Sequence, residues 1–585
     1  MSTLNAELFG SKGGKLDAIA LEVPRSAGHE FKFSYAQLQA STAKLQRQIA
    51  GCGIPRGATV SSSLINGAEF VGVFLATAAQ GLVAAPLNPN YKESEVRFYL
   101  DDTQSKLLVV PSGALRGGQV SDGAKAAVSA GRAEGVRMAE VVLDVEHAQM
   151  QLVDEHGQPL PDGAEQQAEP EDTALVLHTS GTTGRPKAVP LTHRNLAASM
   201  HNIQKTYELS SSDKSFIVMP LFHVHGLLCG LLASLLAGGS VVLPPRFSAS
   251  SFWDEFVHHG ANWYTAVPTI HQILLNSPRP DPLPNLRFVR SCSSSLSAAT
   301  FRALEAALQA PVLEAYAMTE AAHQMTSNPL PPGTRKPGAV GFGHGVEVRV
   351  LNERGEELPA GTNGEVCVRG ANVTKGYVNN DKANRDSFFR TAYGNCPPDV
   401  DGFLRTGDQG HKDNDGYLVL TGRIKELINR SGEKISPLEV DAALLEVPGI
   451  KEAVSFGIPD PMYGEVVGAA VVLQDDAKQS VTDATIRNAL SQKIIKFKVP
   501  ERIWIADSIP KTYVSPAPTC ILTAVPPARS SAAMWPVASW NRPSSECCRS
   551  PPHSHHLHAL HLRTRQVTVT ATEQHVQPTA AACEP

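Results

Sequence analysis

The chain has 585 residues, 42% of them apolar, and a formal net charge of −5 at pH 7. This length is too great for one hydrophobic core, so we expect two or more domains. The apolar content and the small net charge exclude a disordered chain and a nucleic-acid binder, and they favour small acidic metabolites as partners.

The first hundred residues alternate between helix-like and strand-like segments. Such alternation favours parallel β-α-β layers, and hence an α/β fold. Residues 112–171 are polar and lack a sustained period, so we interpret them as a surface insertion without chemistry. The expected helices cover residues 35–52, 68–79 and 92–101, and the expected strands cover residues 81–87 and 106–110.

Neither the start of the chain nor its most apolar window indicates a membrane protein. The first ten residues lack the basic flank and apolar core of a secretory signal, so we expect an intracellular protein. Residues 226–243 approach the length of a membrane span, about 20 residues. Gly238 and Gly239 divide this window into a helix-like half and a strand-like half, so we expect no span. The cysteines within residues 1–512 lack paired spacing and are expected to be reduced core thiols; they are Cys52, Cys229, Cys292, Cys367 and Cys396.

A loop rich in glycine and hydroxyl residues follows the apolar run 174–177. Its amides and hydroxyls can face one anion, to which Lys187 adds a positive charge. Thr192 is a plausible N-cap, so we expect the loop to join a strand to a helix. The spacing matches neither a P-loop nor a dinucleotide-binding loop, and an ordinary surface turn is the alternative. The expected phosphate-binding residues are Thr179, Ser180, Gly181, Thr182, Thr183 and Gly184.

The run 179–187 closely resembles the phosphate loop of adenylate-forming enzymes, which include acyl-CoA synthetases, luciferases and peptide-synthetase adenylation domains. Ala188 stands where that family usually has a glycine, which reduces backbone freedom. The resemblance implies a large N-terminal domain of layered sheets and helices and a small, mobile α+β lid. We place these domains at residues 1–422 and 423–512, followed by an irregular tail at 513–585.

Two further signatures, at residues 314–320 and 421–435, follow in the family's order. In the first, Tyr316 can stack on adenine, the Thr319 hydroxyl suits the α-phosphate, and the Glu320 carboxylate suits Mg²⁺. The resemblance gives Lys425 the role of hinge and places Gly432 on the path of the pantetheine arm of coenzyme A. It implies further nucleotide contacts from Glu314, Ala315, Asp408 and Arg423. The catalytic residues that we expect are Lys187, His223, Thr319 and Glu320.

The acyl site is expected around the sequence Phe222-His-Val-His and the serine turn 293–295. Two histidines in such a pattern are usually core or surface residues, and the resemblance assigns a function only to the first. Finer motifs, at 222–228, 263–271, 290–293 and 318–324, resemble the oxalate-activating branch of the acyl-CoA synthetases. A site edged by several donors and little apolar surface suits a small dianion. Its expected substrate-binding residues are His223, Ser293, Ser295 and His323.

The resemblance implies an acid–thiol ligase that uses ATP, Mg²⁺ and coenzyme A, with oxalate as the expected acid. Another small or aromatic acid is one alternative. A nucleotide-binding pseudoenzyme is the other, because the family's closing Pro-Lys-Thr-x-x-Gly-Lys is only partly present. Residues 510–512 match this motif, and no lysine follows Lys511.

The tail after Thr512 is rich in proline, serine, histidine and cysteine, and its spacings fit no standard zinc site. Our hypothesis is that it derives from a misread gene end, such as a retained intron or a frameshift. A peroxisomal address would be lost with the true end, so we expect a cytoplasmic protein and keep the peroxisome as the alternative.

Overall fold

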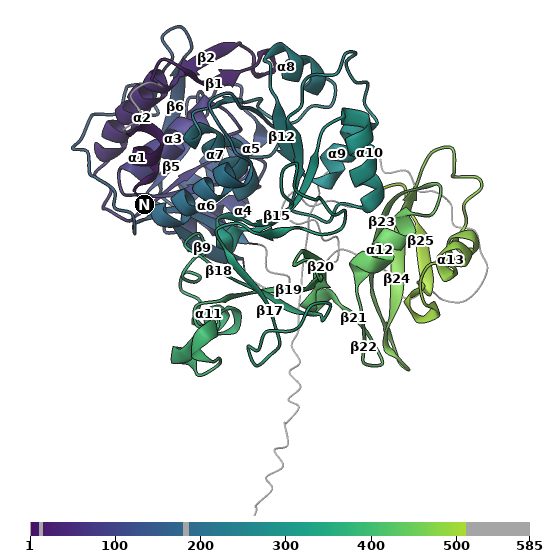
Figure 1. Cartoon of the computed structure of the whole chain (residues 1–585). Helices are drawn as coiled ribbons and strands as arrows, with labels where there is room; N and C mark the ends of the chain where they lie inside the picture. The colour runs from purple at the N-terminus through teal and green to yellow at the C-terminus, as the bar shows by residue number, and fades with distance from the viewer. Residues whose placement is uncertain (1, 11–15, 180–185, 510–585) are drawn as a thin grey trace, which may run out of the picture. The chain divides into compact units, whose positions relative to one another are not determined.

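The computed structural model describes residues 2–10, 16–179 and 186–509, which lie in the first of two units, Met1–Ala524. The strands of these residues form four sheets, of seven, nine, four and five strands (Figure 1). The α/β class expected from the sequence is confirmed, because helices alternate with parallel strands in the two largest sheets.

The seven-stranded sheet is built from the β-α-β units predicted at the start of the chain. Its five inner strands run parallel, and an antiparallel strand closes each edge. In sheet order the strands are β7 (Gln149–Val153), β6 (Arg137–Asp144), β5 (Leu107–Pro111), β3 (Thr59–Ser62), β4 (Val83–Pro86), β8 (Thr173–Thr179) and β9 (Lys187–Thr192). The predicted helices correspond to α2 (Tyr35–Ala50), α3 (Ala68–Ala79) and α4 (Glu93–Asp102).

The interpretation of residues 112–171 as a surface insertion is wrong, since α5 (Asp122–Ala133), β6 and β7 lie there. The core-facing side of α5 is made largely of alanine and glycine, which produces little hydrophobic contrast. In β6 a charged residue, Glu140, is buried, and it accepts hydrogen bonds from the Leu115 amide at 2.6 Å and from Arg116 Nη2 at 2.6 Å. Small and charged residues on buried faces therefore concealed both elements.

The expectation that the phosphate loop joins a strand to a helix is also wrong. Residues after the loop form β9, which pairs antiparallel with β8 through Thr179 and Lys187, so the loop connects two strands of a hairpin. The helix α6 (His193–Thr206) begins only after β9, and the Thr192 hydroxyl caps it by accepting the Asn195 amide at 3.2 Å, as predicted. Residues 180–184 themselves lie outside the described ranges.

The nine-stranded sheet is parallel in its centre and antiparallel at both edges. Strands β15 and β2 each pair antiparallel with a neighbour from the parallel part, and β16 forms the edge beside β15. In sheet order it contains β16 (Phe342–Gly343), β15 (His323–Ser327), β14 (Val312–Met318), β13 (Phe288–Ser291), β12 (Trp263–Ala266), β10 (Lys214–Ile217), β11 (Ser240–Val242), β1 (Ile19–Val23) and β2 (Phe31–Ser34).

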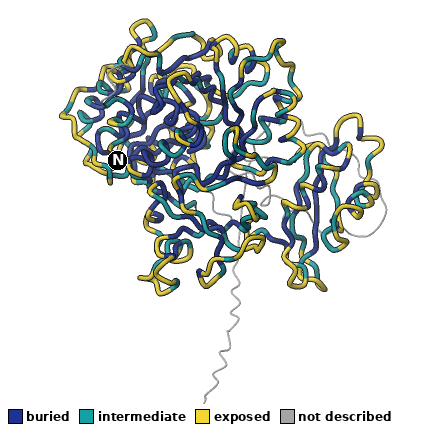
Figure 2. Tube along the Cα trace, viewed as in Figure 1, coloured by how far each residue is buried: buried dark blue, intermediate teal, exposed yellow. Residues whose placement is uncertain are grey.

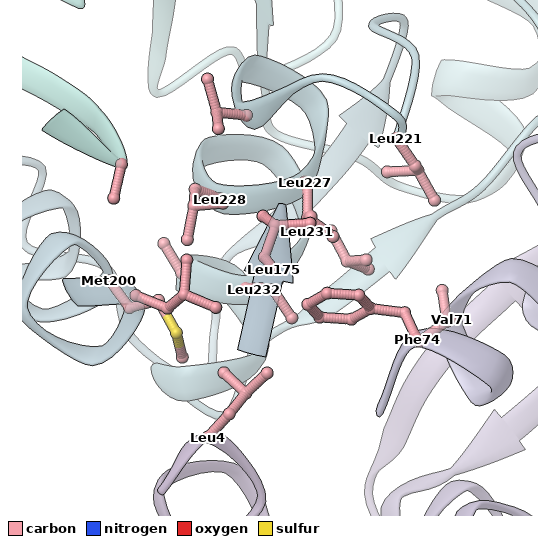
Figure 3. Packing of buried hydrophobic residues seen from close by; sticks show 14 of the residues in the cluster. Leu4, Val71, Phe74, Leu175, Met200, Leu221, Leu227, Leu228, Leu231 and Leu232 are labelled. Carbon is pink, nitrogen blue, oxygen red and sulfur yellow. The ribbon is translucent and has the colours of Figure 1, made fainter. Parts of the chain in front are cut away.

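A layer of buried helices separates these two sheets. Helix α3 packs on the seven-stranded sheet, the π-helix η2 (His225–Leu232) packs on the nine-stranded sheet, and α6 contacts both. The layer also holds α1 (Leu4–Phe9) and α7 (Ala233–Leu236). Figure 3 shows leucines of η2 gathered with Phe74 of α3 and Met200 of α6. The apolar window 226–243 is thus core, and no helix of the described ranges is long and apolar enough to cross a membrane.

Helices on the outer faces complete a five-layer arrangement. Helices α4 and α5 cover the free face of the seven-stranded sheet around Leu108 and Val110. Helices α8 (Phe252–His258), α9 (Pro268–Leu275) and α10 (Ala298–Leu308) pack on the nine-stranded sheet. Burial is accordingly greatest along the strands and the central helices (Figure 2).

Two smaller sheets follow. The antiparallel four-stranded sheet contains β17 (Glu347–Leu351), β18 (Gly364–Arg369), β19 (Leu404–Lys412) and β20 (Leu418–Arg423), with α11 (Asp381–Ser387) against β19. The last sheet contains β22 (Glu433–Ile435), β21 (Ile428–Arg430), β24 (Gly464–Leu473), β23 (Ile450–Asp460) and β25 (Arg502–Ile505). With α12 (Pro437–Leu445) and α13 (Asp483–Ser491) it has a hydrophobic core of its own. The remaining 3-10 turns are η1 (Arg25–Ala27), η3 (Thr319–Ala321), η4 (Thr391–Tyr393), η5 (Pro398–Val400), η6 (Ile424–Glu426) and η7 (Lys496–Lys498).

The cysteines of the described residues are all free thiols, in agreement with the sequence. Cys229, Cys292 and Cys367 are buried, whereas Cys52 and Cys396 are half-buried.

A buried carboxylate, Glu22 of β1, connects several segments near one edge of the nine-stranded sheet. It bonds to Lys214 Nζ at 2.5 Å, His259 Nδ1 at 2.9 Å and Lys32 Nζ at 3.1 Å. Burial raises the pKa of Glu22, but the hydrogen bonds from His259, Lys214 and Lys32 outweigh burial and lower the pKa to about 2.

We predict that Glu22→Gln lowers the free energy of unfolding by about 2–3 kcal/mol at pH 7. Because the folded-state pKa lies below the ordinary value of 4.5, the stabilisation is complete above about pH 5 and disappears as the pH falls toward 2. Urea unfolding of both proteins between pH 7 and pH 3 measures this. A difference that stays constant over that range would contradict the prediction.

Candidate active site

Three of the predicted nucleotide-binding residues lie together where β14, β19 and β20 meet. The Tyr316 hydroxyl donates to Asp408 Oδ2, and Arg423 Nε bonds to Asp408 Oδ1 at 2.9 Å. Asp408 and Arg423 are also paired in register across β19 and β20. Burial raises the pKa of Asp408 although Arg423 opposes this. Tyr316 is thus fixed through its hydroxyl.

The predicted catalytic residues Lys187 and Glu320 contact the same tyrosine. Tyr377 donates its hydroxyl to Glu320 Oε1 at 2.9 Å, and Lys187 Nζ lies 4.5 Å from the centre of the Tyr377 ring. Lys187 is half-buried, and burial lowers its pKa while Glu320 opposes that change. Thr319 precedes Glu320 at the start of η3. Tyr377 was not identified from the sequence, because an isolated tyrosine in a loop carries no motif.

A segment between β18 and α11 holds this group in place. The Thr374 amide donates to the Glu320 carbonyl at 2.8 Å, and the Thr374 hydroxyl donates to the Pro190 carbonyl at 2.7 Å. The Val378 amide donates to the Ala188 carbonyl at 3.0 Å. These bonds connect β9, which carries Lys187, to η3, which carries Glu320. The spacing between the two predicted catalytic residues is therefore set by a third segment.

The Glu314 carboxylate accepts hydrogen bonds from backbone amides of the protein itself. Its oxygens accept the Leu296 amide at 3.0 Å and the Gly338 amide at 3.3 Å, and burial raises its pKa to about 7. Glu314 thereby holds the end of the serine turn against β14. Of the predicted pair, Ala315 follows Glu314 inside the same buried strand.

Two of the four predicted substrate-binding residues are linked through a histidine that the sequence analysis did not assign. His225 Nδ1 lies 3.0 Å from Ser293 Oγ, and the His225 ring stacks on His323 with 5.0 Å between ring centres. Ser293 and His323 both have left-handed backbone, with φ of +71° and +94°. Burial, with Arg290 as the next cause, lowers the pKa of both His225 and His323 well below 6.5. Both rings are therefore neutral near pH 7.

The other two predicted residues border this group. His223 is half-buried and its ring lies 4.6 Å from that of Phe222, while Ser295 is exposed on the same turn as Ser293. The sequence analysis assigned a function to His223 and not to His225, and the structure places His225, at the start of η2, in the core.

A buried cation, Arg290 of β13, lies beneath this group. Its Nε donates to Tyr207 Oη at 2.6 Å, its Nη1 to Thr265 Oγ1 at 3.1 Å and its Nη2 to Gln324 Oε1 at 3.4 Å. No carboxylate of the described ranges forms an ion pair with it. An arginine in a strand that is otherwise apolar is the signal that could have identified it, since unpaired charges are rarely buried.

The predicted lid residues lie after β20. Lys425 is exposed on η6, and Gly432 forms the turn between β21 and β22 with φ of +95°, where its amide donates to Asn429 Oδ1 at 3.1 Å. Arg423, two residues before Lys425, is the last residue of β20. It belongs to the group of predicted nucleotide-binding residues that also contains Tyr316 and Asp408.

Comparison with protein families assigns most of the chain. Residues 12–378 match the model of the AMP-binding enzymes, and residues 439–514 match the AMP-binding enzyme C-terminal domain.

Curated relatives agree with this assignment. The oxalate–CoA ligase of Saccharomyces cerevisiae is 45% identical over 520 residues, which cover 85% of this chain and 92% of the relative. The oxalate–CoA ligase of Arabidopsis thaliana is 45% identical over 510 residues, covering 85% of this chain and 95% of the relative. The sulfoacetate–CoA ligase of Cupriavidus necator is 36% identical over 488 residues, covering 83% and 90%.

Solved structures share the fold. ATP-bound MatB from Rhodopseudomonas palustris superposes with a TM-score of 0.75 at 30% identity, covering 88% of this chain and 97% of that structure. The o-succinylbenzoate coenzyme A synthetase of Bacillus subtilis, in complex with ATP and magnesium ion, has a TM-score of 0.72 at 26% identity, covering 89% and 98%.

Proposed function

The chain belongs to the family of AMP-binding enzymes, and from this premise we propose that it is an ATP-dependent ligase that joins oxalate to coenzyme A. Two oxalate–CoA ligases at 45% identity support this substrate. The single observation that carries the proposal is the group of neutral histidines and a serine hydroxyl above an unpaired arginine. Such a group offers donors and a positive charge, and little apolar surface, to a small dianion.

The reaction has two steps. A carboxylate oxygen of oxalate attacks the α-phosphorus of ATP, which forms the C–O–P bond of oxalyl-adenylate and releases pyrophosphate. The thiol sulfur of coenzyme A then attacks the acyl carbon; a thioester forms, AMP leaves with the bridging oxygen, and the thiol proton is released.

The residues of the nucleotide group take separate parts of ATP. The Tyr316 ring stacks on adenine, while Asp408 and Arg423 hold the ribose hydroxyls. Lys187, the loop residues 179–184 and Thr319 bind the phosphates. The half-buried setting of Lys187 supports this role, because a phosphate would supply the negative charge that a partly desolvated ammonium favours.

Magnesium fits the donors at Glu320. One carboxylate oxygen accepts a hydrogen bond from Tyr377, and the oxygen ligand type is the one Mg²⁺ prefers when it shares a site with phosphates. When bound, the ion would neutralise charge on the phosphate oxygens of ATP. Glu320 would hold it, and Tyr377 orients that carboxylate.

We propose that the domain boundary lies between residues 422 and 423, with Lys425 as the hinge of a lid that ends at residue 512. The separate hydrophobic core of the five-stranded sheet supports a lid that folds as a unit. Gly432, exposed at a turn of that sheet, would line the path of the pantetheine arm.

We predict that oxalate outcompetes acetate, octanoate and coumarate in a coenzyme A-dependent assay, by at least tenfold in kcat/KM. The reason is that an alkyl or aromatic group cannot accept hydrogen bonds from the donors around Ser293 and His323. Burying such a group there would leave these donors without partners. Thioester formation from each acid at equal ATP and free Mg²⁺ measures the preference. A clear preference for the long or the aromatic acid would refute the assignment of oxalate.

A further inference from the structure

The guanidinium of Arg290 is fully buried and lacks a negative partner among the described residues. Its neighbours are the neutral oxygens of Tyr207, Thr265 and Gln324 and, at 3.5 Å, the Nε2 nitrogen of His225. A buried charge without a counter-ion is costly, and proteins usually remove it or pair it. A ligand that brings a negative charge would supply the missing partner.

Hydrogen-bond direction links this charge to the surface of the site. Arg290 can only donate, and its Nη1 lies 3.1 Å from Thr265 Oγ1 and 3.5 Å from His225 Nε2, while Thr265 Oγ1 lies 2.6 Å from the same nitrogen. His225 Nε2 is then an acceptor, and its proton lies on Nδ1, which donates to Ser293 Oγ at 3.0 Å. The Ser293 hydrogen is therefore left to donate outward, and Ser293 is exposed.

A second ring offers an unpartnered nitrogen nearby. His323, stacked on His225, is 1% exposed, and its Nε2 has no hydrogen-bond partner among the described residues. His271, another buried histidine near His225, has its pKa lowered to about 4 by burial. With these rings neutral, Arg290 is the positive charge of the group.

We propose that Arg290 determines selectivity for a second carboxylate, acting through Thr265, His225 and Ser293 on the carboxylate of the acid that does not react. This inference rests on the proposed ligase function. It adds the residue that lets the site distinguish a dianionic acid from a monoanionic one. Ser293 would contact the second carboxylate, and Arg290 is a positioning residue that fixes the donor direction of Ser293 and balances the charge. The preferred substrates are therefore short dianions, and an equally small monoanion is disfavoured.

The test compares oxalate with oxamate, which has the same size but carries an amide in place of one carboxylate. ATP–pyrophosphate exchange is measured for each acid at constant free Mg²⁺, because oxalate chelates the ion. We expect Arg290→Met to reduce the kcat/KM ratio of oxalate to oxamate by about 30- to 100-fold, the effect of one charge several ångströms away in a partly polar interior. The change should lie in KM for oxalate, with KM for ATP unchanged.

Two matched variants separate charge from structure. Arg290→Lys keeps the charge and should retain the ratio to within about fivefold; loss of the ratio there would overturn the proposal in favour of a structural role. Arg287, three residues earlier, is paired with Asp213 at 2.8 Å, so Arg287→Met should leave the ratio unchanged.

If Arg290→Met fails to fold, a second variant tests the proposal with Arg290 left in place. Ser293→Ala deletes the exposed end of the relay, and it should raise KM for oxalate with little effect on kcat. In addition, oxalate should raise the Tm of the AMP-bound wild type, and oxamate should not. If the wild type does not activate oxalate, the ligase proposal itself is refuted. If the wild type activates oxalate and Arg290→Met keeps the oxalate-to-oxamate ratio, only the role of Arg290 is refuted.

Discussion

Supplied with preformed oxalyl-adenylate and coenzyme A, the chain should form oxalyl-CoA far faster than it does from oxalate and ATP. The family's closing lysine is absent after Lys511, in a segment outside the described residues. By resemblance, that lysine neutralises charge between the attacking carboxylate and the α-phosphate. Its role is comparable to that of an oxyanion-hole donor, whose loss costs about 10²–10³ in rate.

Only the first step should suffer. By the resemblance, the thioester step would use another orientation of the lid, reached at Lys425, and would draw on Gly432 rather than on the distal lysine. Restoring Ser-Gly-Lys-Ile after Thr512, with the residues that anchor it, should recover the ATP-dependent rate. Single-turnover formation of oxalyl-CoA from each starting point is the measurement.

Each other outcome has a definite meaning. If the unmodified chain runs the complete reaction at the rate of the repaired one, another group, such as Lys511, replaces the lysine, and this account of the lid is wrong. If the chain binds ATP but performs neither step, it is a nucleotide-binding pseudoenzyme.

Glu320→Gln should reduce ATP–pyrophosphate exchange by about 10²-fold or more at ordinary Mg²⁺ and raise the Mg²⁺ concentration needed for half-maximal rate. The amide oxygen of glutamine can still accept from Tyr377, so the fold around η3 should survive, and the Tm should change little. A control with the same chemistry is Glu353→Gln, at an exposed turn between β17 and β18, which should leave both quantities unchanged. An unaltered Mg²⁺ dependence in Glu320→Gln would remove this carboxylate from the metal site.

The local pattern of the sequence predicted the helices α2, α3 and α4 and the strands β4 and β5 well. Helix α3 begins and ends at the predicted residues, because its apolar face is continuous and glycines or turns flank it. The strand β6 was not predicted because Glu140 is buried with an ion-pair partner from another segment. The strand β9 was not separated from its loop because its pairing with β8, and not its own composition, defines it.

The site was predictable where one short motif carries it. Tyr316, Asp408 and Arg423 came from separate motifs, and the structure brings them together. Tyr377 belongs to no motif, and the motifs 222–228 and 290–293 gave no role to His225 and Arg290. The importance of all three depends on which residues of distant strands they contact. Sequence periodicity contains no information about such contacts between segments far apart in the chain.

Tyr377 has one more consequence. Lys187 Nζ lies over the Tyr377 ring, Glu320 accepts a hydrogen bond from the hydroxyl of the same residue, and the two side chains form no ion pair in the described part of the chain. Without this shared phenol, the ammonium and the carboxylate could pair with each other before the nucleotide binds. Arriving ATP would then have to break that pair before either group could act. We propose that Tyr377, by contacting both groups, keeps the ammonium available for a phosphate and the carboxylate available for a cation before ATP binds.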